Sequence, residues 1–540
     1  MAFLNWKIAG AAGEGIKVSG LMLQKTAFRT GLFTYGSTEY PSLIRGGHNT
    51  FEVVLSSEPV QSARTKVDLL VDLKTSTIAS LPFPLSDLAK GSGNLLTKNT
   101  VALGGSCALL ALDLTILKQV ITETFGSKDQ SIIDQNHQAA QLGFDYALKN
   151  YPDKKLKLDT PKKPHQDKIM ICGNEALALG AVAGGMKFYC AYPMTPSTPI
   201  LHYLAANAQK LNLVVNHAED EIGVINMAIG AGFAGVRSMV ATSGGGFSLM
   251  VEGLGLAGGT ETPLVIILGM RPGPASGMPT WSGQGDLLFA INAAQDEFPR
   301  IVLAPGDPEE AFDLAAKAQN LAEKYQLPVI ILSDKNMGEG YYTSQRPPDK
   351  YKNRRYSLAP EAAESDQPFK RYLVTDTGIS PRPLPGQPGG VHLANSYEHD
   401  ELGYATEISA ERVKQMNKRL KKLETILGGG DLIAPQLFGP KSAKTTLVSW
   451  GSNKGAIVDA LPQLPDINYL HFSWMWPFPE KQFKALISHN PRLVTIEGNA
   501  TAQLAKLIAQ QTGIIIKDKI LKYDGRRFYP EEIIEAVKKL

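Results

Sequence analysis

The sequence contains few cysteines, and none lies close enough to another in sequence to form a C-x-x-C motif. Only Cys107, Cys172 and Cys190 occur among the 540 residues, and no two of them are spaced as C-x-x-C. Three scattered cysteines exclude a disulfide framework, and they cannot build an iron–sulfur cluster or a structural zinc site without help from another chain. Cysteine usage of this kind is typical of a reducing compartment, so we expect a cytoplasmic protein.

The sequence also lacks an excess of either charge and any long apolar run. There are 55 Lys and Arg against 52 Asp and Glu, a formal net charge of +3. This balance argues against a nucleic-acid-binding surface. Apolar runs such as residues 264–268 are much shorter than the ~18 residues of a membrane span. Glycines at positions 10 to 15 interrupt any signal-peptide-like stretch, so we expect neither a membrane span nor a secreted protein.

The length and the alternation of strand-like and helical patterns predict an α/β protein of about three domains. Strands separated by helices form parallel sheets covered on both faces, so the predicted fold is three doubly wound α/β domains. The boundaries follow composition: a first domain over 1–155, a linker over 156–168, a second domain over 169–340, a connecting arm over 341–440 and a last domain over 441–540. In the second domain we expect strands at 187–191, 213–216, 238–242, 264–269, 301–304 and 329–333.

A glycine-rich turn lies near the N-terminus. Gly10-Ala-Ala-Gly13-Glu-Gly15 follows a short apolar run and precedes a helical pattern. Strand, glycine turn and helix is the context in which a backbone approaches a phosphate. The spacing is not G-x-G-x-x-G, and no acidic residue ends a second strand to hold a ribose. A phosphate site and a tight strand-to-helix turn therefore both remain open.

The stiffest loop of the sequence is Tyr192-Pro-Met-Thr-Pro-Ser-Thr-Pro199. Its three prolines fix φ, so the side chain of Thr195 is held on a backbone with few rotatable bonds. Ser197 or Thr198 can cap the following helix, with Pro199 in its first turn. Taken alone, the loop predicts a rigid, well-capped turn.

This loop resembles the YPITP-type motif of the 2-oxoacid:ferredoxin oxidoreductase family, with Met194 in place of the usual isoleucine. Other segments resemble the family in the same order: 241–250 (ATSGGGFSLM), 270–280 (MRPGPASGMPT), 398–403 (EHDELG) and 476–479 (WPFP). The opening glycine turn and Arg45-Gly46-Gly47 resemble the family's small γ-type domain. The resemblance covers nearly the whole chain and identifies an α subunit with a γ-type domain fused to its N-terminus.

The resemblance implies two transketolase-like later domains, one of which binds the pyrimidine ring of thiamine diphosphate. It also implies a β subunit that shares this cofactor and carries the diphosphate site, Mg²⁺ and a [4Fe–4S] cluster. The sequence agrees, because it contains neither a GDG motif with an Asn-rich end nor cluster cysteines. The implied reaction is the oxidative decarboxylation of a 2-oxoacid with coenzyme A, giving acyl-CoA, CO₂ and electrons for ferredoxin. We expect no metal site within this chain.

The resemblance also assigns site residues. Glu221 matches the catalytic glutamate, whose carboxyl bonds to pyrimidine N1′ of the cofactor; a desolvated carboxyl with a raised pKa suits that shared proton. Tyr192, Pro193 and Thr195 match the cofactor-binding loop. Substrate contacts fall on Thr195, Arg271 and Thr280, and a guanidinium on a stiff loop can grip a carboxylate bidentately. A purely structural alternative is that residues 219–221 complement the positive end of a helix dipole.

The resemblance further implies a coenzyme A contact near Gly13, Gly15 or Arg45 in the first domain. One departure concerns the substrate: many relatives carry a basic residue after Thr280, where this sequence has Trp281. If that basic residue binds a second carboxylate, a preference for 2-oxoglutarate is in doubt.

Other polar residues fit structural roles. We interpret Asn174, Ser243 and Asp286 as caps or turn formers. His399-Asp400-Glu401 has no second ligand cluster and is interpreted as an exposed or interface turn.

Several functions stay open at this point. The substrate is 2-oxoglutarate or a broad range of 2-oxoacids that includes pyruvate, and the alternative within the same chemistry is an indolepyruvate-type specificity. A non-catalytic assembly subunit that only binds the β partner is a second hypothesis. A free-standing nucleotide-binding oxidoreductase is a third, and it would require NAD(P) binding by the isolated chain.

Overall fold

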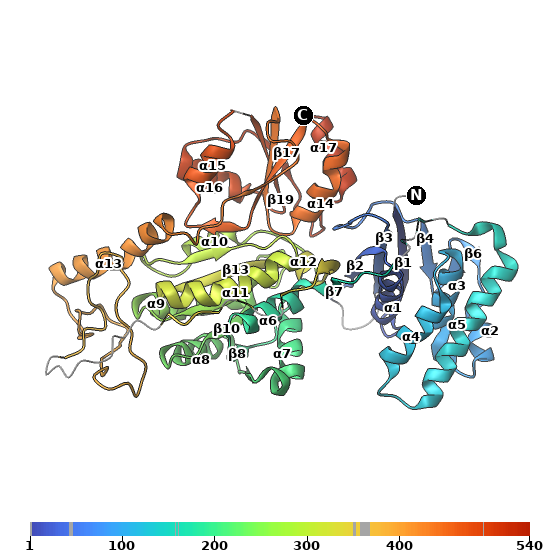
Figure 1. Ribbon diagram of the computed structural model, residues 1–540, viewed down its shortest axis with the longest axis horizontal. Coiled ribbons are helices and arrows are strands. Elements are labelled where there is room, and N and C mark those ends of the chain that lie inside the picture. The colour runs from blue at the N-terminus through green and yellow to red at the C-terminus, as the bar shows by residue number, and fades with distance from the viewer. Residues whose placement is uncertain are drawn as a thin grey trace.

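The protein consists of three α/β units and an extended arm (Figure 1). The computed structural model describes residues 3–42, 47–156, 158–159, 161, 163–348, 351, 353–356, 368–489 and 491–540. In Figure 1 the N-terminal unit lies on the right, the second unit in the centre and the C-terminal unit above it, while α13 (Ser409–Gly428) extends to the left. Three α/β sheets were predicted from the sequence, and three are found.

The first sheet is mixed and contains strands from two parts of the chain. Its order is β6 (Leu81–Pro82), β5 (Thr77–Ile78), β4 (Leu69–Asp72), β1 (Phe3–Ala11), β3 (His48–Ser56), β2 (Phe33–Glu39), β14 (Tyr341–Gln345) and β7 (Lys168–Cys172). β3 runs antiparallel to both β1 and β2, which differs from the doubly wound pattern expected here, because the connection from β2 to β3 is too short for a crossover helix. β7 and β14 flank the second unit in sequence yet complete this sheet, so they tie the first two units together.

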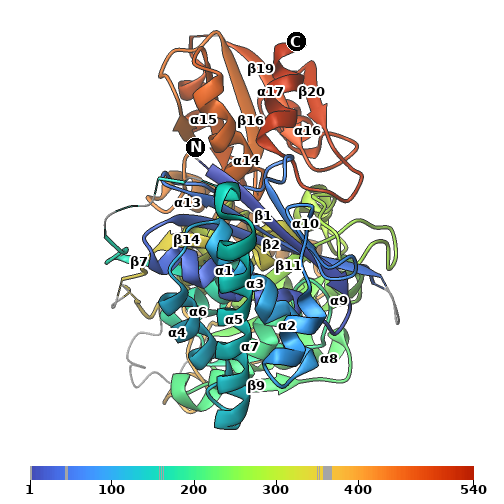
Figure 2. The same ribbon diagram turned by 90° about the vertical axis from the view of Figure 1, so that its right-hand side faces the viewer.

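Helices cover the first sheet as Figure 2 shows from its side. They are α1 (Ile16–Arg29), α2 (Leu85–Gly91), α3 (Lys98–Leu109), α4 (Leu114–Phe125) and α5 (Gln130–Asn150). Across the described residues of the whole chain, no helix combines the length and the apolar character needed to cross a bilayer.

The second sheet is the parallel sheet predicted from the alternating pattern. Its order is β18 (Trp474–Trp476), β12 (Ile301–Leu303), β13 (Pro328–Asp334), β11 (Leu264–Met270), β10 (Ser238–Ser243), β8 (Phe188–Ala191) and β9 (Val214–His217). All neighbours are parallel except β18, an edge strand supplied by the C-terminal unit. The connecting helices are α6 (Gly173–Ala183), α7 (Thr198–Leu211), α8 (Glu221–Phe233), α9 (Gly244–Gly259), α10 (Leu287–Asn292), α11 (Pro308–Tyr325) and α12 (Lys335–Glu339).

The third sheet belongs to the C-terminal unit. Its order is β15 (Gln436–Phe438), β17 (Ile467–Phe472), β16 (Thr445–Trp450), β19 (Arg492–Glu497) and β20 (Asp518–Leu521), with β15 as the one antiparallel strand among these. Its helices are α14 (Asn453–Ala460), α15 (Glu480–Leu486), α16 (Gln503–Thr512) and α17 (Pro530–Lys538).

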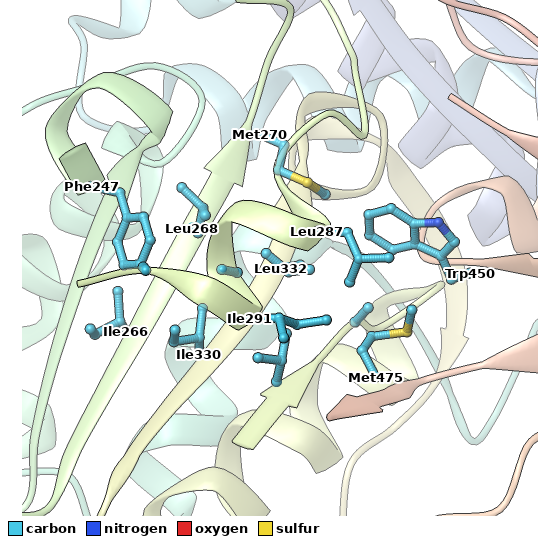
Figure 3. Close-up of a cluster of buried hydrophobic side chains, with 14 of the residues drawn as sticks. Phe247, Ile266, Leu268, Met270, Leu287, Ile291, Ile330, Leu332, Trp450 and Met475 are labelled. Carbon is cyan, nitrogen blue, oxygen red and sulfur yellow. The ribbon is translucent and has the colours of Figure 1, made fainter. Parts of the chain in front are cut away.

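A single buried cluster joins the second and third sheets. Leu268, Met270 and Leu287 of the second unit contact the same core as Trp450 and Met475 of the C-terminal unit (Figure 3). Burial of apolar surface on both sides stabilises the contact by roughly 25 cal/mol per Å². The C-terminal unit is therefore held against the second unit by a continuous core as well as by surface contacts.

The arm is anchored by a buried charge cluster. The helix of the arm, α13, is rich in basic residues, and one of its faces is buried. The ammonium groups of Lys418 and Lys422 both pair with Glu261, beyond the end of α9, and Lys422 lies 2.6 Å from its carboxylate. Although burial opposes ionisation, these two cations hold the pKa of Glu261 well below its usual range. Burial lowers the pKa of Lys422 to about 8, against the attraction of Glu261.

Removing the carboxylate should destabilise the arm strongly. Glu261→Gln leaves two buried ammonium groups without an anion, which we expect to cost about 3–5 kcal/mol of unfolding free energy. Glu424→Gln is the matched control, because Glu424 is exposed and pairs with Lys421 only at the surface, where a pair contributes less than ~1 kcal/mol. Calorimetric unfolding measures both; equal midpoints for the two variants would contradict this account of the arm.

Candidate active site

Four parallel strands deliver polar residues to one edge of the second sheet. β9 is followed by Glu221, β8 by the loop 192–197, β10 by Gly244 and β11 by Arg271. Neighbouring parallel strands end on the same side, and open α/β sheets bind their ligands outside those carboxyl ends. The fold therefore brings together three predicted site residues that are up to 76 positions apart in sequence: Thr195, Glu221 and Arg271.

Glu221 is the first residue of α8, and its side chain is buried with one oxygen unpaired. It is 3% exposed, and Oε1 has no hydrogen-bond partner within the described part of the chain. Asp220 caps the helix instead, accepting a 2.7 Å bond from the Gly223 amide. Helix capping thus explains Asp220 but leaves Oε1 of Glu221 available. Burial raises the pKa of Glu221, so its carboxyl holds a proton more readily than a solvated one.

The start of α9 packs directly against this carboxyl. A Cβ on Gly246 would lie 2.5 Å from Oε1 of Glu221 and 2.1 Å from Oγ1 of Thr242. Only glycine fits this contact without displacing the carboxyl. Glycine at position 246 therefore fixes the distance between the N-terminal turns of α8 and α9.

Arg271 ties two of the strand-end loops together. Its Nη1 donates a 2.8 Å hydrogen bond to the carbonyl oxygen of Thr195. Gly269 allows Pro196 to lie close to β11 on the same side, since a Cβ on Gly269 would be 3.2 Å from the Pro196 ring. No carboxylate among the described residues forms an ion pair with Arg271, so its guanidinium is held in place without being neutralised. Partial burial lowers its pKa, but a guanidinium remains charged at physiological pH.

The other predicted site residues lie around this centre. Thr280 is 5% exposed, and its Oγ1 is buried without a hydrogen-bond partner in the described structure. Tyr192 and Pro193 are exposed at the rim. Gly13 and Gly15 lie in a different unit, and Arg45 falls outside the described residues.

The N-terminal glycine turn lines a cavity of its own. Gly13 and Gly15 have φ of 92° and 72°, which other residues rarely adopt, and they lead from β1 into α1 as predicted. The cavity has a volume of about 370 Å³, and its lining includes Lys17, Thr38 and Asn49. A cation and backbone amides at a helix N-terminus are groups that bind anions.

Several large hydrophobic side chains of the second unit are exposed, among them Ile222, which follows Glu221 in α8. They lie on β9, α8, the start of α9 and the loop after β8: Tyr192, Val214, Ile222, Met227 and Leu249, each between 39% and 61% exposed. Large exposed apolar groups gathered at a site are typical of a protein interface.

Comparison with known proteins agrees with these features. Residues 179–419 match the family described as pyruvate flavodoxin/ferredoxin oxidoreductase, thiamine diphosphate-binding, and residues 5–81 and 73–146 match the pyruvate ferredoxin/flavodoxin oxidoreductase family. The 2-oxoacid:ferredoxin oxidoreductase subunit alpha of a Sulfolobus species is 32% identical over 99% of this chain and 97% of its own length. The chain belongs to the family of 2-oxoacid:ferredoxin oxidoreductase α subunits.

Two further members of this family are informative. The 2-oxoglutarate synthase subunit KorA of Methanothermobacter thermautotrophicus is 32% identical over 69% of this chain and 99% of its own length. The solved 2-oxoglutarate:ferredoxin oxidoreductase from Magnetococcus marinus, with 2-oxoglutarate, coenzyme A and succinyl-CoA bound, superposes with a TM-score of 0.91 at 30% identity. It covers 100% of this chain and 99% of that one. The fold of this α subunit, including its N-terminal unit, is therefore that of the family.

Asp286 lies next to the first residue of α9, whereas the sequence indicated no more than a cap or turn former. It occupies the N-cap position of α10 but makes no capping hydrogen bond with its side chain. Its Oδ2 faces the first residue of α9, 3.1 Å from where a Cβ of Gly244 would stand. Burial raises the pKa of Asp286 to about 6. Nothing in its local sequence signals this, because the burial comes from α9.

The raised pKa predicts a pH-dependent effect of Asp286→Asn on stability. The carboxyl titrates near pH 3.9 in the unfolded chain, so above pH 6 the native protein bears a buried charge that costs up to about 3 kcal/mol. The cost shrinks as pH falls from 6 to 4, where the native carboxyl takes up its proton first. Asp286→Asn should therefore stabilise the protein at pH 8, with a gain that fades by pH 4.

Thermal midpoints measured from pH 8 to pH 4 test this, with Asp376→Asn as the control because Asp376 is exposed. A gain that is constant across this range, or that grows toward pH 4, would show that the buried charge is not its cause.

Proposed function

We propose that this chain is the α subunit of a thiamine-diphosphate-dependent 2-oxoacid:ferredoxin oxidoreductase that oxidatively decarboxylates a 2-oxoacid with coenzyme A. The products are acyl-CoA, CO₂ and two electrons for ferredoxin. One observation supports the proposal above the others: a buried carboxyl, Glu221, keeps one oxygen unpaired at the sheet edge where Arg271 and Thr195 also meet.

Glu221 fits the aminopyrimidine ring of thiamine diphosphate. A buried oxygen without a partner costs roughly 1–3 kcal/mol, which a ring nitrogen bonded to it would recover. Its raised pKa suits a carboxyl that holds a proton at pyrimidine N1′. When bound, the cofactor supplies the carbanion-stabilising centre. Gly246 lets α9 pack against the carboxyl and so holds it in place.

Arg271 fits the 1-carboxylate of the 2-oxoacid. Its Nη1 is already oriented by the Thr195 carbonyl, so the remaining donors of the guanidinium are aimed without further ordering of the side chain. The hydroxyls of Thr195 and Thr280 add uncharged contacts to the same substrate, and the unpaired Oγ1 of Thr280 supports this assignment. Tyr192 and Pro193 at the rim contact the cofactor ring.

A β subunit would cover exposed apolar side chains on α8 and the elements next to it. Val214, Ile222 and Leu249 are apolar side chains that water solvates poorly, and a partner seated there would also close the cofactor site from solvent. That partner would hold the cofactor diphosphate, Mg²⁺ and a [4Fe–4S] cluster, for which the three scattered cysteines of this chain are insufficient.

Coenzyme A fits the cavity at the N-terminal glycine turn. Gly13 and Gly15 leave the backbone of the turn free of side chains, so that a ligand can approach it closely. The Lys17 side chain adds a positive charge, which suits phosphate groups. The solved Magnetococcus marinus relative has coenzyme A bound, which supports coenzyme A as a ligand of this chain.

A non-catalytic assembly subunit is the alternative from another class. Such a subunit would have no use for a desolvated carboxyl with an unpaired oxygen, since the burial lowers stability without a compensating bond. An indolepyruvate-type specificity would retain Glu221 and Arg271, so relative rates on different 2-oxoacids distinguish it.

Glu221→Gln should abolish turnover without unfolding the chain. Glutamine keeps the shape but cannot share a proton, so kcat should fall by at least ~100-fold. The assay is 2-oxoacid-dependent dye reduction by the chain co-expressed with its β partner. Glu219→Gln is the matched control, because Glu219 is exposed two residues away. Full activity in Glu221→Gln would favour the assembly subunit over the enzyme.

Arg271→Lys should weaken the use of every 2-oxoacid. Lysine keeps a positive charge but loses the planar, two-pronged donor set, at about 1.5–3 kcal/mol per charge-assisted bond. The expected result is a 10- to 100-fold lower kcat/KM for the 2-oxoacid, seen mainly as a higher KM, in steady-state kinetics. An unchanged KM would place the substrate carboxylate elsewhere.

A further inference from the structure

A guanidinium from the C-terminal unit reaches the loop that follows β11. The segment between β20 and α17 folds over residues 278–282, and the amide of Ser282 donates a 3.1 Å hydrogen bond to the carbonyl of Gly525. A Cβ on Gly525, whose φ is 82°, would lie 3.1 Å from the Met278 side chain and 3.3 Å from Trp281. Because Gly525 packs closely against this loop, the position of the next residue, Arg526, is fixed. The guanidinium of Arg526 stacks 3.1 Å from the centre of the Trp281 ring.

Arg526 differs from the neighbouring cations because it pairs with no anion among the described residues. In the same segment Lys522 pairs with Glu532 at 2.7 Å, and Arg527 pairs with Glu52 at 3.2 Å. The Nη1 of Arg526 is buried and makes no hydrogen bond to any described residue. The nearest acid in sequence, Asp524, accepts a bond from the Arg526 backbone amide, which orders the turn but leaves the guanidinium unpaired.

This unpaired cation faces a small cavity shared with Thr280. The lining includes Thr280, Trp281, Lys335 and Arg526, and the volume is about 30 Å³. Thr280 contributes a second buried polar atom without a partner, Oγ1. Two unsatisfied groups around one cavity, each costing roughly 1–3 kcal/mol, indicate a ligand that accepts hydrogen bonds and carries negative charge.

The charges of the cavity favour a monoanionic group. Besides Arg526 the lining includes Lys335 and Arg527 against one carboxylate, Glu39. Lys335 donates a 2.7 Å hydrogen bond to the Thr38 carbonyl and pairs with Glu339 at 3.8 Å, and Arg527 lies 3.6 Å from Glu39. Arg526 is therefore the lining cation left to bind a ligand.

The size of the cavity distinguishes a carboxylate from the phosphates of coenzyme A. A volume of about 30 Å³ exceeds what one water molecule requires but is less than a tenth of the cavity at Gly13 and Gly15, about 370 Å³. The smaller cavity is lined by Thr280, Trp281 and Ser282 of the loop that follows β11. The next residue, Gly283, packs against the start of this loop, since its Cβ would lie 3.4 Å from the carbonyl carbon of Arg271.

We propose that Arg526 binds the distal carboxylate of a dicarboxylic 2-oxoacid such as 2-oxoglutarate, while Arg271 binds the 1-carboxylate. This inference rests on the proposed function. The ring of Trp281 stacks against the guanidinium of Arg526 and holds it next to Thr280. The cation that determines specificity therefore comes from a segment 245 residues away in sequence. In this inference Arg526 takes the role that a basic residue at position 281 would have. A dicarboxylic substrate is then compatible with tryptophan at that position.

The test compares two substrates in Arg526→Gln, Arg526→Lys and Arg492→Gln, each co-expressed with the β partner. Arg492 is the matched control, because it is a partly exposed arginine of the same unit whose partner is Asp518. We expect the ratio of kcat/KM for 2-oxoglutarate to kcat/KM for pyruvate to fall about 10- to 100-fold in Arg526→Gln, the loss of one charge-assisted bond. Arg526→Lys should lie between, and Arg492→Gln should keep the wild-type ratio.

A structural effect on the loop would instead lower both rates together. An equal fall for the two substrates, an unchanged ratio, or a higher KM for coenzyme A in Arg526→Gln would overturn the inference. Inhibition by glutarate gives an independent reading, and its Ki should rise by the same factor as the ratio falls. Wild-type turnover of pyruvate but not of 2-oxoglutarate would refute the inference alone, whereas turnover of no 2-oxoacid at all would refute the proposed function.

Discussion

The account depends on one buried carboxyl, one oxygen of which has no hydrogen-bond partner among the residues that the structure describes. Glu221 starts α8 at an edge where four parallel strands end, and Asp220 rather than Glu221 caps that helix. A desolvated carboxyl is stable only if its surroundings hold it in place, and Gly246 does so by allowing α9 to pack against it. The positions of Arg271 and Thr195 follow from the same strand ends.

The units of the chain are joined by strand pairing and by a shared core. β7 and β14 extend the first sheet from within the second unit, and a common core holds the C-terminal unit against the second. Pairing and core packing of this kind limit relative motion of the units. A fixed C-terminal unit is what allows Arg526 to stack on Trp281 of the second unit.

Local sequence patterns predicted the second unit best. Its strands lie within about two residues of the expected positions, because short apolar runs that alternate with helical patterns mark buried parallel strands clearly. The motif resemblance located Glu221, Thr195 and Arg271, and the structure brings these residues to one edge. Their roles in binding and catalysis remain proposals.

Long-range features could not be predicted in the same way. The extension of the first sheet by β14 joins strands about 300 residues apart, and no local pattern encodes such pairing. Burial of Lys418 and Lys422 beside Glu261 reverses the usual preference of lysine for the surface. Asp286 and Arg526 have ordinary sequence surroundings, and their environments arise only where separate elements meet.

The most direct measurement is a structure of the assembled α–β complex with thiamine diphosphate and a 2-oxoacid bound. The account predicts that a carboxylate oxygen of Glu221 lies within about 2.6–3.2 Å of pyrimidine N1′, with Arg271 bonded to the carboxylate next to the keto group. A cofactor ring bound elsewhere, with Glu221 still unpaired or covered only by the partner's side chains, would contradict it.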